Sequence, residues 1–447
     1  MGIEQVPLNE FITLQRGFDL PKGDRLEGTI PVVASTGIGG YHNIAKVEAP
    51  GVVIGRSGSI GGGQFIKEPF WPLNTTLWIK DFKGHDPRYV YYLMRSIDFS
   101  IFNVGSGVPT LNRNHLSSLL VNELGINNER AIAQLLGDLD DKIDINSQIN
   151  STLEQMAQAL FKSWFVDFDP VIDNALDAGF FEQDLAFSEE LLRRAELRKT
   201  VRESDDFKPL SEDIRQLFPN AFEECTESTL GLGGWVPSGW ELGNLSDVTD
   251  ILSGFAFKSN EFQNSGFGVI KIKNIGNDKS VDICDIQRID ISLAEKAKRF
   301  SLKDGDLLMA MTGATVGKFG FLVTENQEPY YLNQRVAKFE AIDESTAYLY
   351  CILNRKITES YIVNTAQGSA QPNISAKDIL AMPLITAPQS IRELFNDKTN
   401  DSFQKIIQMR KQNIILEHLR DTLLPKLISG ELSLDNIKID IPEETLI

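Results

Sequence analysis

Hydrophobic and polar positions along this chain follow a pattern of short strands and glycine-rich turns that occurs twice. The stretch APGVVIGRSGSIGG at 49–62 corresponds to KDGDLLMAMTGATVGK at 303–318, and both predict a strand that enters a tight turn. WPLNTTLWI at 71–79 corresponds to YYLNQRVAKF at 330–339, and each is followed by a short aromatic helix, RYVYYLMRS or AYLYCILNR. The matching order predicts an internal duplication of a unit that mixes strands and helices.

A closing passage ends each copy, GSGVPTLNRNHLSSLL at 105–120 and QGSAQPNISAKDILAM at 367–382. Both begin a short helix, because Asn112 and Ser375 are good N-cap residues and Ser375 with Asp378 forms a capping box. Two pairs of residues share one offset of 263 positions, namely Leu111 with Ile374 and Leu153 with Leu416. The duplication therefore continues into the segment that follows the passage.

A long helical stretch follows each copy, and in the first its seam residues alternate at spacings of three and four, the heptad pattern of a coiled coil. The predicted seam is Ile132, Leu135, Leu139, Lys142, Asn146, Ile149, Leu153, Met156 and Leu160. Lys142 and Asn146 interrupt its apolar character, which fixes register at some cost in stability. The second seam, more polar, has Phe395, Met409, Leu416, Leu419 and Leu423 at equivalent positions. It needs a partner helix.

Length and composition restrict the class of protein. A chain of 447 residues predicts two to four domains at roughly 100–200 residues each, and a hydrophobic content of 42% is typical of globular proteins. No apolar run is long enough for a membrane helix and the acidic start lacks signal-peptide features, so we expect a cytoplasmic chain without a membrane partner. The three cysteines and four histidines have no disulfide or metal-ligand spacing, and we expect no metal.

The net charge of −18 at first argues against nucleic acid, because a DNA-binding surface replaces phosphate counterions with lysine and arginine. The charge is uneven, however: +1 for residues 1–122, −14 for 123–239, −3 for 240–386 and −2 for 387–447. Most of the acidity lies in one middle segment that includes an insert at about 170–235. The two repeated parts are nearly neutral, which leaves room for a basic groove on either.

Three motifs resemble enzyme signatures and fail on their spacing. GATVGKF at 313–319 has three residues between its glycines and Phe319 after its lysine, so it is not a P-loop but a turn between strands. The other glycine stretches lack Rossmann spacing. DPRY at 86–89 differs from a methyltransferase signature at Arg88 and is explained as a helix start. The acidic stretches DLDDKID and ESDD are interpreted as solvated surfaces.

Several further phrases recur in a fixed order: the turns GRSGSIGG and MTGATVGK, the passage QGSAQPNIS, the helix LEQMAQALFKSWFVDFDP, the ending LRDTLLPKLISGEL, and the linker phrase LFPNAFEE with WVPSGW. Together they resemble the DNA-specificity subunit of type I restriction-modification enzymes over nearly the whole chain. The resemblance implies an α+β fold: two mixed target-recognition domains in tandem pseudo-repeat, joined by a long antiparallel two-helix coiled coil.

The expected boundaries follow the repeat. They are target-recognition domain 1 at 1–125, spacer helix 1 at 126–168, an acidic linker at 169–236, target-recognition domain 2 at 237–386, spacer helix 2 at 387–430 and a C-terminal tail at 431–447.

The resemblance also implies the function. Each target-recognition domain reads one half of a bipartite double-stranded DNA sequence, two methyltransferase subunits dock on the assembly, and restriction or translocase subunits join it in phage defence. The chain itself carries no catalytic residue and binds no cofactor, because S-adenosylmethionine belongs to the methyltransferase partner. Two alternatives stay open: a self-sufficient DNA methyltransferase or endonuclease with an unrecognised site, and a coiled-coil scaffold that binds proteins.

Polar side chains on and near the glycine turns are the candidate DNA contacts, because a turn without bulk lets the backbone approach phosphate while its neighbours reach base edges. The first copy offers Arg56, Ser57, Ser59, Asn74, Asn112 and Arg113. The second offers Thr312, Thr315, Lys318, Asn333, Arg335, Gln367, Ser369, Gln371 and Asn373, with Lys271 and Lys273 for phosphates. For Asn112 and Asn373 a role as cap or turn residue is an equal alternative.

The long helix would act as a ruler. From Glu129 to Phe165 it would measure roughly 55 Å at 1.5 Å per residue, enough for two domains to meet successive DNA turns about 34–36 Å apart. Four residues added within 139–156 would then lengthen the spacer by about 6 Å and change the half-site gap.

Overall fold

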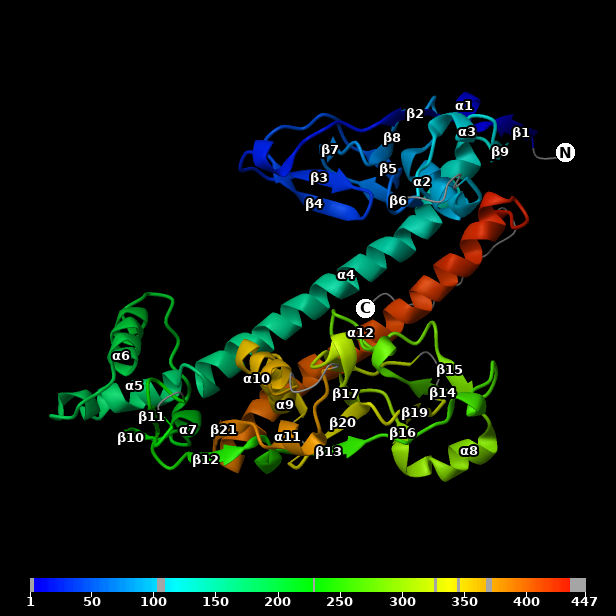
Figure 1. Ribbon diagram of the computed structural model, residues 1–447. Coiled ribbons are helices and arrows are strands. Elements are labelled where there is room, and N and C mark those ends of the chain that lie inside the picture. The colour runs from blue at the N-terminus through cyan, green and yellow to red at the C-terminus, as the bar shows by residue number, and fades with distance from the viewer. Residues whose placement is uncertain are drawn as a thin grey trace. The chain divides into compact units, whose positions relative to one another are not determined.

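The computed structural model describes residues 4–102, 109–227, 230–324, 328–343, 346–366 and 372–434. Its contacts divide the chain into two compact units, Met1–Asp144 with Ile415–Ile447, and Ile145–Ile414. Each unit contains one copy of the repeat and parts of both long helices, α4 (Ile126–Phe165) and α12 (Gln389–Ile428). The elements of each unit can be followed in Figure 1.

The first copy is built on short strands and three short helices. Its strands are β1 (Glu4–Pro7), β2 (Thr13–Arg16), β3 (Ile30–Ala34), β4 (Gly37–His42), β5 (Gly51–Gly55), β6 (Gly61–Ile66), β7 (Trp71–Pro72), β8 (Thr76–Asp81) and β9 (Leu120–Glu123), and its helices are α1 (Leu8–Phe11), α2 (Pro87–Ser96) and α3 (Arg113–Leu116). An antiparallel sheet has the order β2-β8-β5-β6, a second sheet the order β4-β3-β7, and β1 pairs with β9. Helix α2 packs on β5 and β6.

The second copy repeats this topology. Its strands are β12 (Glu241–Asn244), β13 (Thr249–Ser253), β14 (Phe267–Ile270), β15 (Gln287–Ile289), β16 (Ser301–Leu302), β17 (Leu307–Ala310), β18 (Phe319–Phe321), β19 (Tyr330–Leu332), β20 (Val336–Ala341) and β21 (Pro383–Thr386), and its helices are α8 (Ile291–Lys296), α9 (Thr346–Leu353), α10 (Lys356–Ala366) and α11 (Ala376–Leu380). The sheet orders are β13-β20-β17-β18 and β15-β14-β19-β16, and β12 pairs with β21. The predicted duplication of a mixed unit is confirmed.

The 263-residue offset holds element by element at the end of each copy. Helices α3 and α11 begin 263 residues apart, and the same offset relates both bounds of β9 to β21 and of α4 to α12, each long helix having 40 residues. The predicted caps are present: the Asn112 side chain accepts a hydrogen bond from the amide of Asn114, and Ser375 with Asp378 forms the capping box. The GATVGK stretch is a turn between β17 and β18, as expected.

A Gly-Phe pair occurs near the start of each copy, Gly17-Phe18 and Gly254-Phe255, and its glycine lies close to the backbone of another segment. A Cβ on Gly17 would lie 2.1 Å from the Leu73 carbonyl oxygen, and one on Gly254 would lie 2.3 Å from the Asn333 carbonyl oxygen. Contacts this short leave no room for a side chain, so glycine is required at both positions. The pair therefore packs against the backbone of the Leu-Asn dipeptide in both copies.

Helices α4 and α12 run antiparallel inside each unit. In the first unit Arg420 pairs with Asp140 at 2.8 Å, and in the second Arg410 pairs with Glu154 at 2.8 Å, so rising numbers on one helix meet falling numbers on the other. The buried Asn146 amide donates to the side chains of Gln412 and Asn413, at 2.8 Å each. Such a polar layer favours one register over its neighbours.

The buried face of α4 differs from the predicted seam at alternate positions. Ile149 and Met156 are 37% and 62% exposed, whereas the next residues, Asn150 and Ala157, are buried. Ile132 and Asn146, shared by both registers, are buried as expected. Ile149 and Met156 continue the apolar heptad of the sequence, but the structure buries Asn150 and Ala157 in their place.

Most of the other seam positions are at least partly buried. Leu135, Leu139, Leu160 and Leu423 are partly buried and pack against the cores, Phe395 and Met409 are buried, and Lys142, Leu153 and Leu416 are also partly buried. On α12, Leu419 is 45% exposed and departs from the prediction, because Leu424 and Leu427 carry the burial near that end.

The acidic stretch on α4 is only in part the solvated face that the sequence predicted, because Asp138 and Asp144 are exposed but Asp140 and Asp141 form ion pairs. Asp141 accepts from Arg88 on α2 at 2.8 Å, and Arg88 also donates to the Gly137 carbonyl at 2.9 Å. The hydrogen bond from Arg88 holds the pKa of Asp141 down to about 2. Asp140 accepts from the Tyr92 hydroxyl at 2.6 Å as well as from Arg420. These carboxylates fasten α4 to its neighbours in the first unit.

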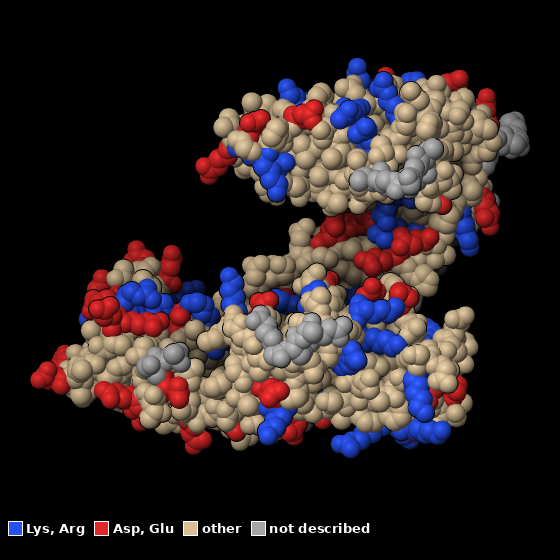
Figure 2. All heavy atoms as spheres, in the orientation of Figure 1, with Lys and Arg blue, Asp and Glu red and all other residues tan. Residues whose placement is uncertain are grey.

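The linker between the copies is held by a ladder of ion pairs. It contains α5 (Asp169–Asp177), α6 (Glu189–Arg202), α7 (Glu212–Arg215), β10 (Phe222–Glu224) and β11 (Trp235–Pro237). Asp169, Asp173 and Asp177 of α5 meet Arg194, Arg198 and Arg202 of α6, with a constant separation of 25 residues. Acidic and basic side chains accordingly intermingle over this part of the surface (Figure 2). Much of the linker's negative charge is thus compensated locally.

A pair of substitutions on α4 tests the observed burial. Phe161→Ala should lower the free energy of unfolding by about 3–5 kcal/mol, because the ring is 1% exposed and packs 5.9 Å from Phe395, centroid to centroid. Met156→Ala, five residues earlier on the same helix, should cost less than about 1 kcal/mol. Urea unfolding followed by circular dichroism measures both, and equal losses would argue for the heptad seam as first predicted.

Candidate nucleic-acid interface

Each copy has a surface depression where its glycine turn meets its closing passage. In the first copy the Gly58 amide donates to the Pro109 carbonyl at 3.0 Å, and the Leu111 amide donates to the Arg56 carbonyl at 2.8 Å. In the second the Gly313 amide donates to Pro372 at 2.9 Å, and Ile374 to Met311 at 3.0 Å. The two depressions are therefore built by the same backbone hydrogen bonds.

The first depression has a volume of about 650 Å³ and contains four cationic side chains, Arg16, Arg56, Lys80 and Arg113. They come from β2, from the turn after β5, from β8 and from α3. Arg56 is partly buried and the other three are exposed. Thr13, Gln15, Thr110 and Asn112 add polar groups to the same wall.

Arg16 and Arg56 lie close together and bind one acceptor. The Arg16 Nε donates to the Asn74 carbonyl at 3.4 Å, and Arg56 Nη1 donates to the same oxygen at 3.2 Å. Burial lowers the pKa of Arg56, and the charge of Arg16 lowers it further. Among the described residues neither guanidinium forms an ion pair with a carboxylate. Two like charges held together in this way favour an anion in the depression.

The other predicted residues of the first copy have mixed positions. Arg113 lines the depression, and so does Asn112, which also caps α3. The Asn74 side chain donates to Asp19, so only its carbonyl serves the arginines. Ser57 bridges to Thr110 at the turn, and Ser59 is exposed outside the lining.

The second depression is smaller and less charged. Its volume is about 470 Å³, and it is lined by Met311, Thr312, Gln334, Arg335, Pro372, Asn373 and Ile374. Arg335 and Asn373 are exposed, and Arg335 is its only cation among the described residues. The Thr312 hydroxyl oxygen is buried and has no hydrogen-bond partner among the residues that the structure describes. A hydroxyl of this kind can accept or donate to a ligand.

Two predicted phosphate contacts of the second copy lie elsewhere. Lys273 pairs with Asp285 at 2.6 Å, and the Lys271 ammonium lies 3.4 Å from the centroid of the Phe262 ring. Both lysines lie between β14 and β15 in the chain, and neither lines the second depression. The sequence alone did not indicate that Asp285 and Phe262 would be the partners of these lysines.

Three further predicted residues of the second copy, Thr315, Lys318 and Asn333, do not line the depression. Thr315 and Lys318 stand on the turn beside it, and the Asn333 side chain accepts from the Arg335 amide at 3.4 Å as a turn residue. Gln367, Ser369 and Gln371 lie outside the described residues.

Sequence reasoning missed Arg16 and Lys80. Arg16 directly precedes the Gly-Phe pair that marks the repeat, and Lys80 directly follows the alternating stretch after the Leu-Asn dipeptide. Arg16 ends β2 and Lys80 lies one residue before the end of β8, and the two strands pair antiparallel. The sheet brings both residues into the lining, which the local sequence does not indicate.

Over the described ranges, the side chains of histidine, cysteine, aspartate and glutamate form no group suited to a metal ion. Among the helices described, none is long and apolar enough to cross a membrane.

Comparison with known proteins gives consistent matches. Residues 2–155 and 237–407 match the model of the type I restriction modification DNA specificity domain. The chain is 31% identical over 335 residues to the HindI type I restriction enzyme specificity subunit of Haemophilus influenzae, covering 72% of this chain and 71% of that one. It is 23% identical over 357 residues to the MjaIX specificity subunit of Methanocaldococcus jannaschii, covering 78% and 70%. The crystal structure of a type I system S subunit from M. genitalium has the same fold, with a TM-score of 0.57, 15% identity and 96% coverage of both chains.

Proposed function

The chain belongs to the family of type I restriction-modification DNA specificity domains, and we propose that it is the subunit that reads a bipartite DNA target for a restriction-modification complex. Each repeat would read one half of the target with its depression. The observation that carries this proposal is the pair of depressions built by the same backbone hydrogen bonds but lined by different side chains.

The difference between the two linings supports two different half-sites. Arg56 in the first copy has Met311 as its counterpart, because each gives its carbonyl to the equivalent amide of the closing passage. Arginine can donate two hydrogen bonds to guanine in the major groove, whereas the Met311 side chain is buried in the core and can donate none. The cations of the first depression can bind phosphate or guanine. The second depression presents Thr312, Gln334 and Asn373, which can form hydrogen bonds with base edges.

The proposal extends to partners and chemistry. Two methyltransferase subunits would dock on the chain and carry S-adenosylmethionine, and a restriction or translocase subunit would add cleavage. The chain itself would bind no cofactor, contain no catalytic residue and work in the cytoplasm. The relatives' names as specificity subunits support this division of labour.

The purified chain, incubated alone with S-adenosylmethionine and duplex DNA, should transfer no methyl group. Incorporation of a labelled methyl group measures this, with a complete type I complex as the positive control. Methylation without an added subunit would favour the alternative of a self-sufficient methyltransferase.

Removing the two adjacent arginines tests the first depression. If each contacts a phosphate, the double variant Arg16→Gln/Arg56→Gln should bind DNA more weakly, with a salt dependence of log K reduced by about 2. Fluorescence anisotropy between roughly 50 and 200 mM salt measures the slope.

The matched control is Lys67→Gln/Lys83→Gln, which removes the same charge from the same unit outside the depression. Lys67 pairs with Asp141 and Lys83 donates to the Asn9 carbonyl. An equal loss in both double variants would mean that overall charge, and not the depression, binds DNA.

Matched insertions test the helices as a ruler. Seven residues added between Asp144 and Ile145 and seven between Ile414 and Ile415 keep the heptad and lengthen both helices by about 10 Å. The preferred gap between half-sites should grow by about three base pairs at 3.4 Å each. Selection of duplexes with variable gaps measures the change, and an unchanged gap would rule out the ruler.

A further inference from the structure

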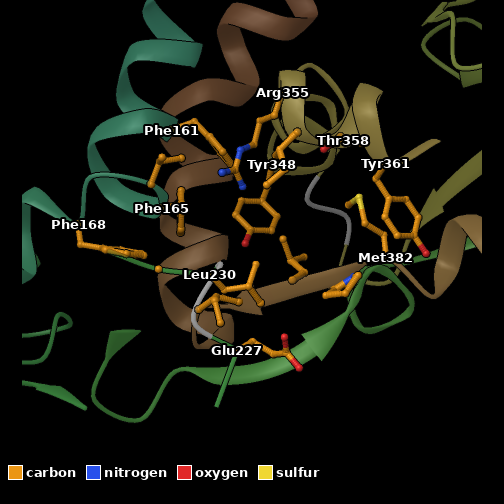
Figure 3. A pocket seen from close by; sticks show the side chains of 16 residues that line it. Phe161, Phe165, Phe168, Glu227, Leu230, Tyr348, Arg355, Thr358, Tyr361 and Met382 are labelled. Atoms are coloured by element: carbon orange, nitrogen blue, oxygen red, sulfur yellow. The ribbon is translucent and has the colours of Figure 1, made fainter. Parts of the chain in front are cut away.

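A cavity of about 260 Å³ lies within the second unit, away from the depressions just described. The end of α4 and the loop after it contribute Phe161, Phe165 and Phe168, α9 contributes Tyr348, and Met382 and Leu384 close the opposite side. All six side chains are buried. Figure 3 shows these aromatic and apolar side chains around the cavity.

Two polar groups line this apolar cavity without a partner of their own. The side chains of Arg355 and Tyr348 lie next to each other at the cavity (Figure 3). Among the described residues neither the guanidinium nor the Tyr348 hydroxyl has a hydrogen-bond or ion-pair partner. Burial lowers the pKa of Arg355 and raises that of Tyr348. The arginine nevertheless stays charged at every pH at which the protein is folded.

Arg355 is partly exposed, so water reaches its guanidinium, but apolar walls surround the charge and the described residues offer it no acceptor. Polar groups that converge in a largely apolar pocket usually fix the orientation of a ligand. The charges of Arg392 and Asp343, also in this unit, are already satisfied by each other at 2.8 Å. An anion in the cavity would supply the partner that the described residues do not.

The lining restricts the kind of anion. A single planar guanidinium matches a carboxylate by two parallel hydrogen bonds, and the Tyr348 hydroxyl can donate a third. Glu227, exposed where it lines the cavity, would oppose any anion, and a doubly charged phosphate more than a singly charged carboxylate. The aromatic and aliphatic walls favour an apolar body, and the volume allows only a small one.

We propose that this cavity binds a small organic carboxylate with an aromatic or branched aliphatic body, its carboxylate on Arg355 and Tyr348. The ligand would contact α4, α9 and β21 together and so stabilise the second unit. The site is independent of the DNA-reading depressions and is tested without DNA.

The experiment uses the full-length chain and 3-phenylpropionate as the probe. The carboxylate should raise the Tm by about 2–4 °C at saturation and give a measurable Kd by calorimetry. The neutral 3-phenylpropanamide, which has the same body, should bind about ten-fold more weakly or worse, and inorganic phosphate, which lacks the body, should give no shift.

Variants identify the residues. Arg355→Gln should weaken binding of 3-phenylpropionate at least about ten-fold, and Tyr348→Phe by a smaller factor. Lys356→Gln, which removes the adjacent exposed cation outside the cavity lining, should leave the Kd unchanged. If Arg355→Gln does not fold, the weaker binding of 3-phenylpropanamide to the unchanged chain and the weaker binding of 3-phenylpropionate to Tyr348→Phe test the proposal. No Tm shift with 3-phenylpropionate, equal binding of the amide, or full affinity in Arg355→Gln would each overturn the proposal.

Discussion

Packing of both long helices into each repeat's core is the constraint on which the structure depends. The core of the first unit combines Ile132 and Leu136 of α4 with Leu424 and Leu427 of α12. The core of the second unit combines Phe161 and other residues near the end of α4 with residues from the start of α12. The second unit is one continuous stretch, Ile145–Ile414, whereas the first unit completes its core only with the end of the last helix of the chain. In that unit, Asn122 donates to the Ser429 carbonyl 307 residues away.

This constraint explains why the two copies share their backbone arrangement but differ in the side chains of the depressions. The sheet orders, the Gly-Phe contact, the closing passage and the length of the helices are shared, because each positions the reading surface on the helices. The apolar residues that line the depressions, Leu77, Leu111, Met311 and Ile374, belong to these cores, whereas the polar and charged side chains beside them lie outside the cores and differ between the copies. Arg16 has Ser253 as its counterpart before the Gly-Phe pair, and Arg56 has Met311. A common scaffold with different linings is what a two-part recognition protein requires.

The sequence predicted the scaffold better than the site. Repeated apolar runs, glycine turns and caps are local signals, and they located the duplication and both long helices. The seam was less predictable, because the shared positions fit two heptad registers and Asn150 and Ala157 give no apolar signal. Site residues were harder still. Arg16 and Arg56 are 40 positions apart and meet only through the order of strands β2, β8 and β5, while the partners of Lys271 and Lys273 come from tertiary contacts.

Selection of bound duplexes from a random library, with the full chain and its partner subunits, tests the central claim most directly. The account predicts a target of two short specified blocks separated by a gap of fixed length, with different sequences in the two blocks. One contiguous block, two identical blocks or the absence of any sequence preference would contradict it.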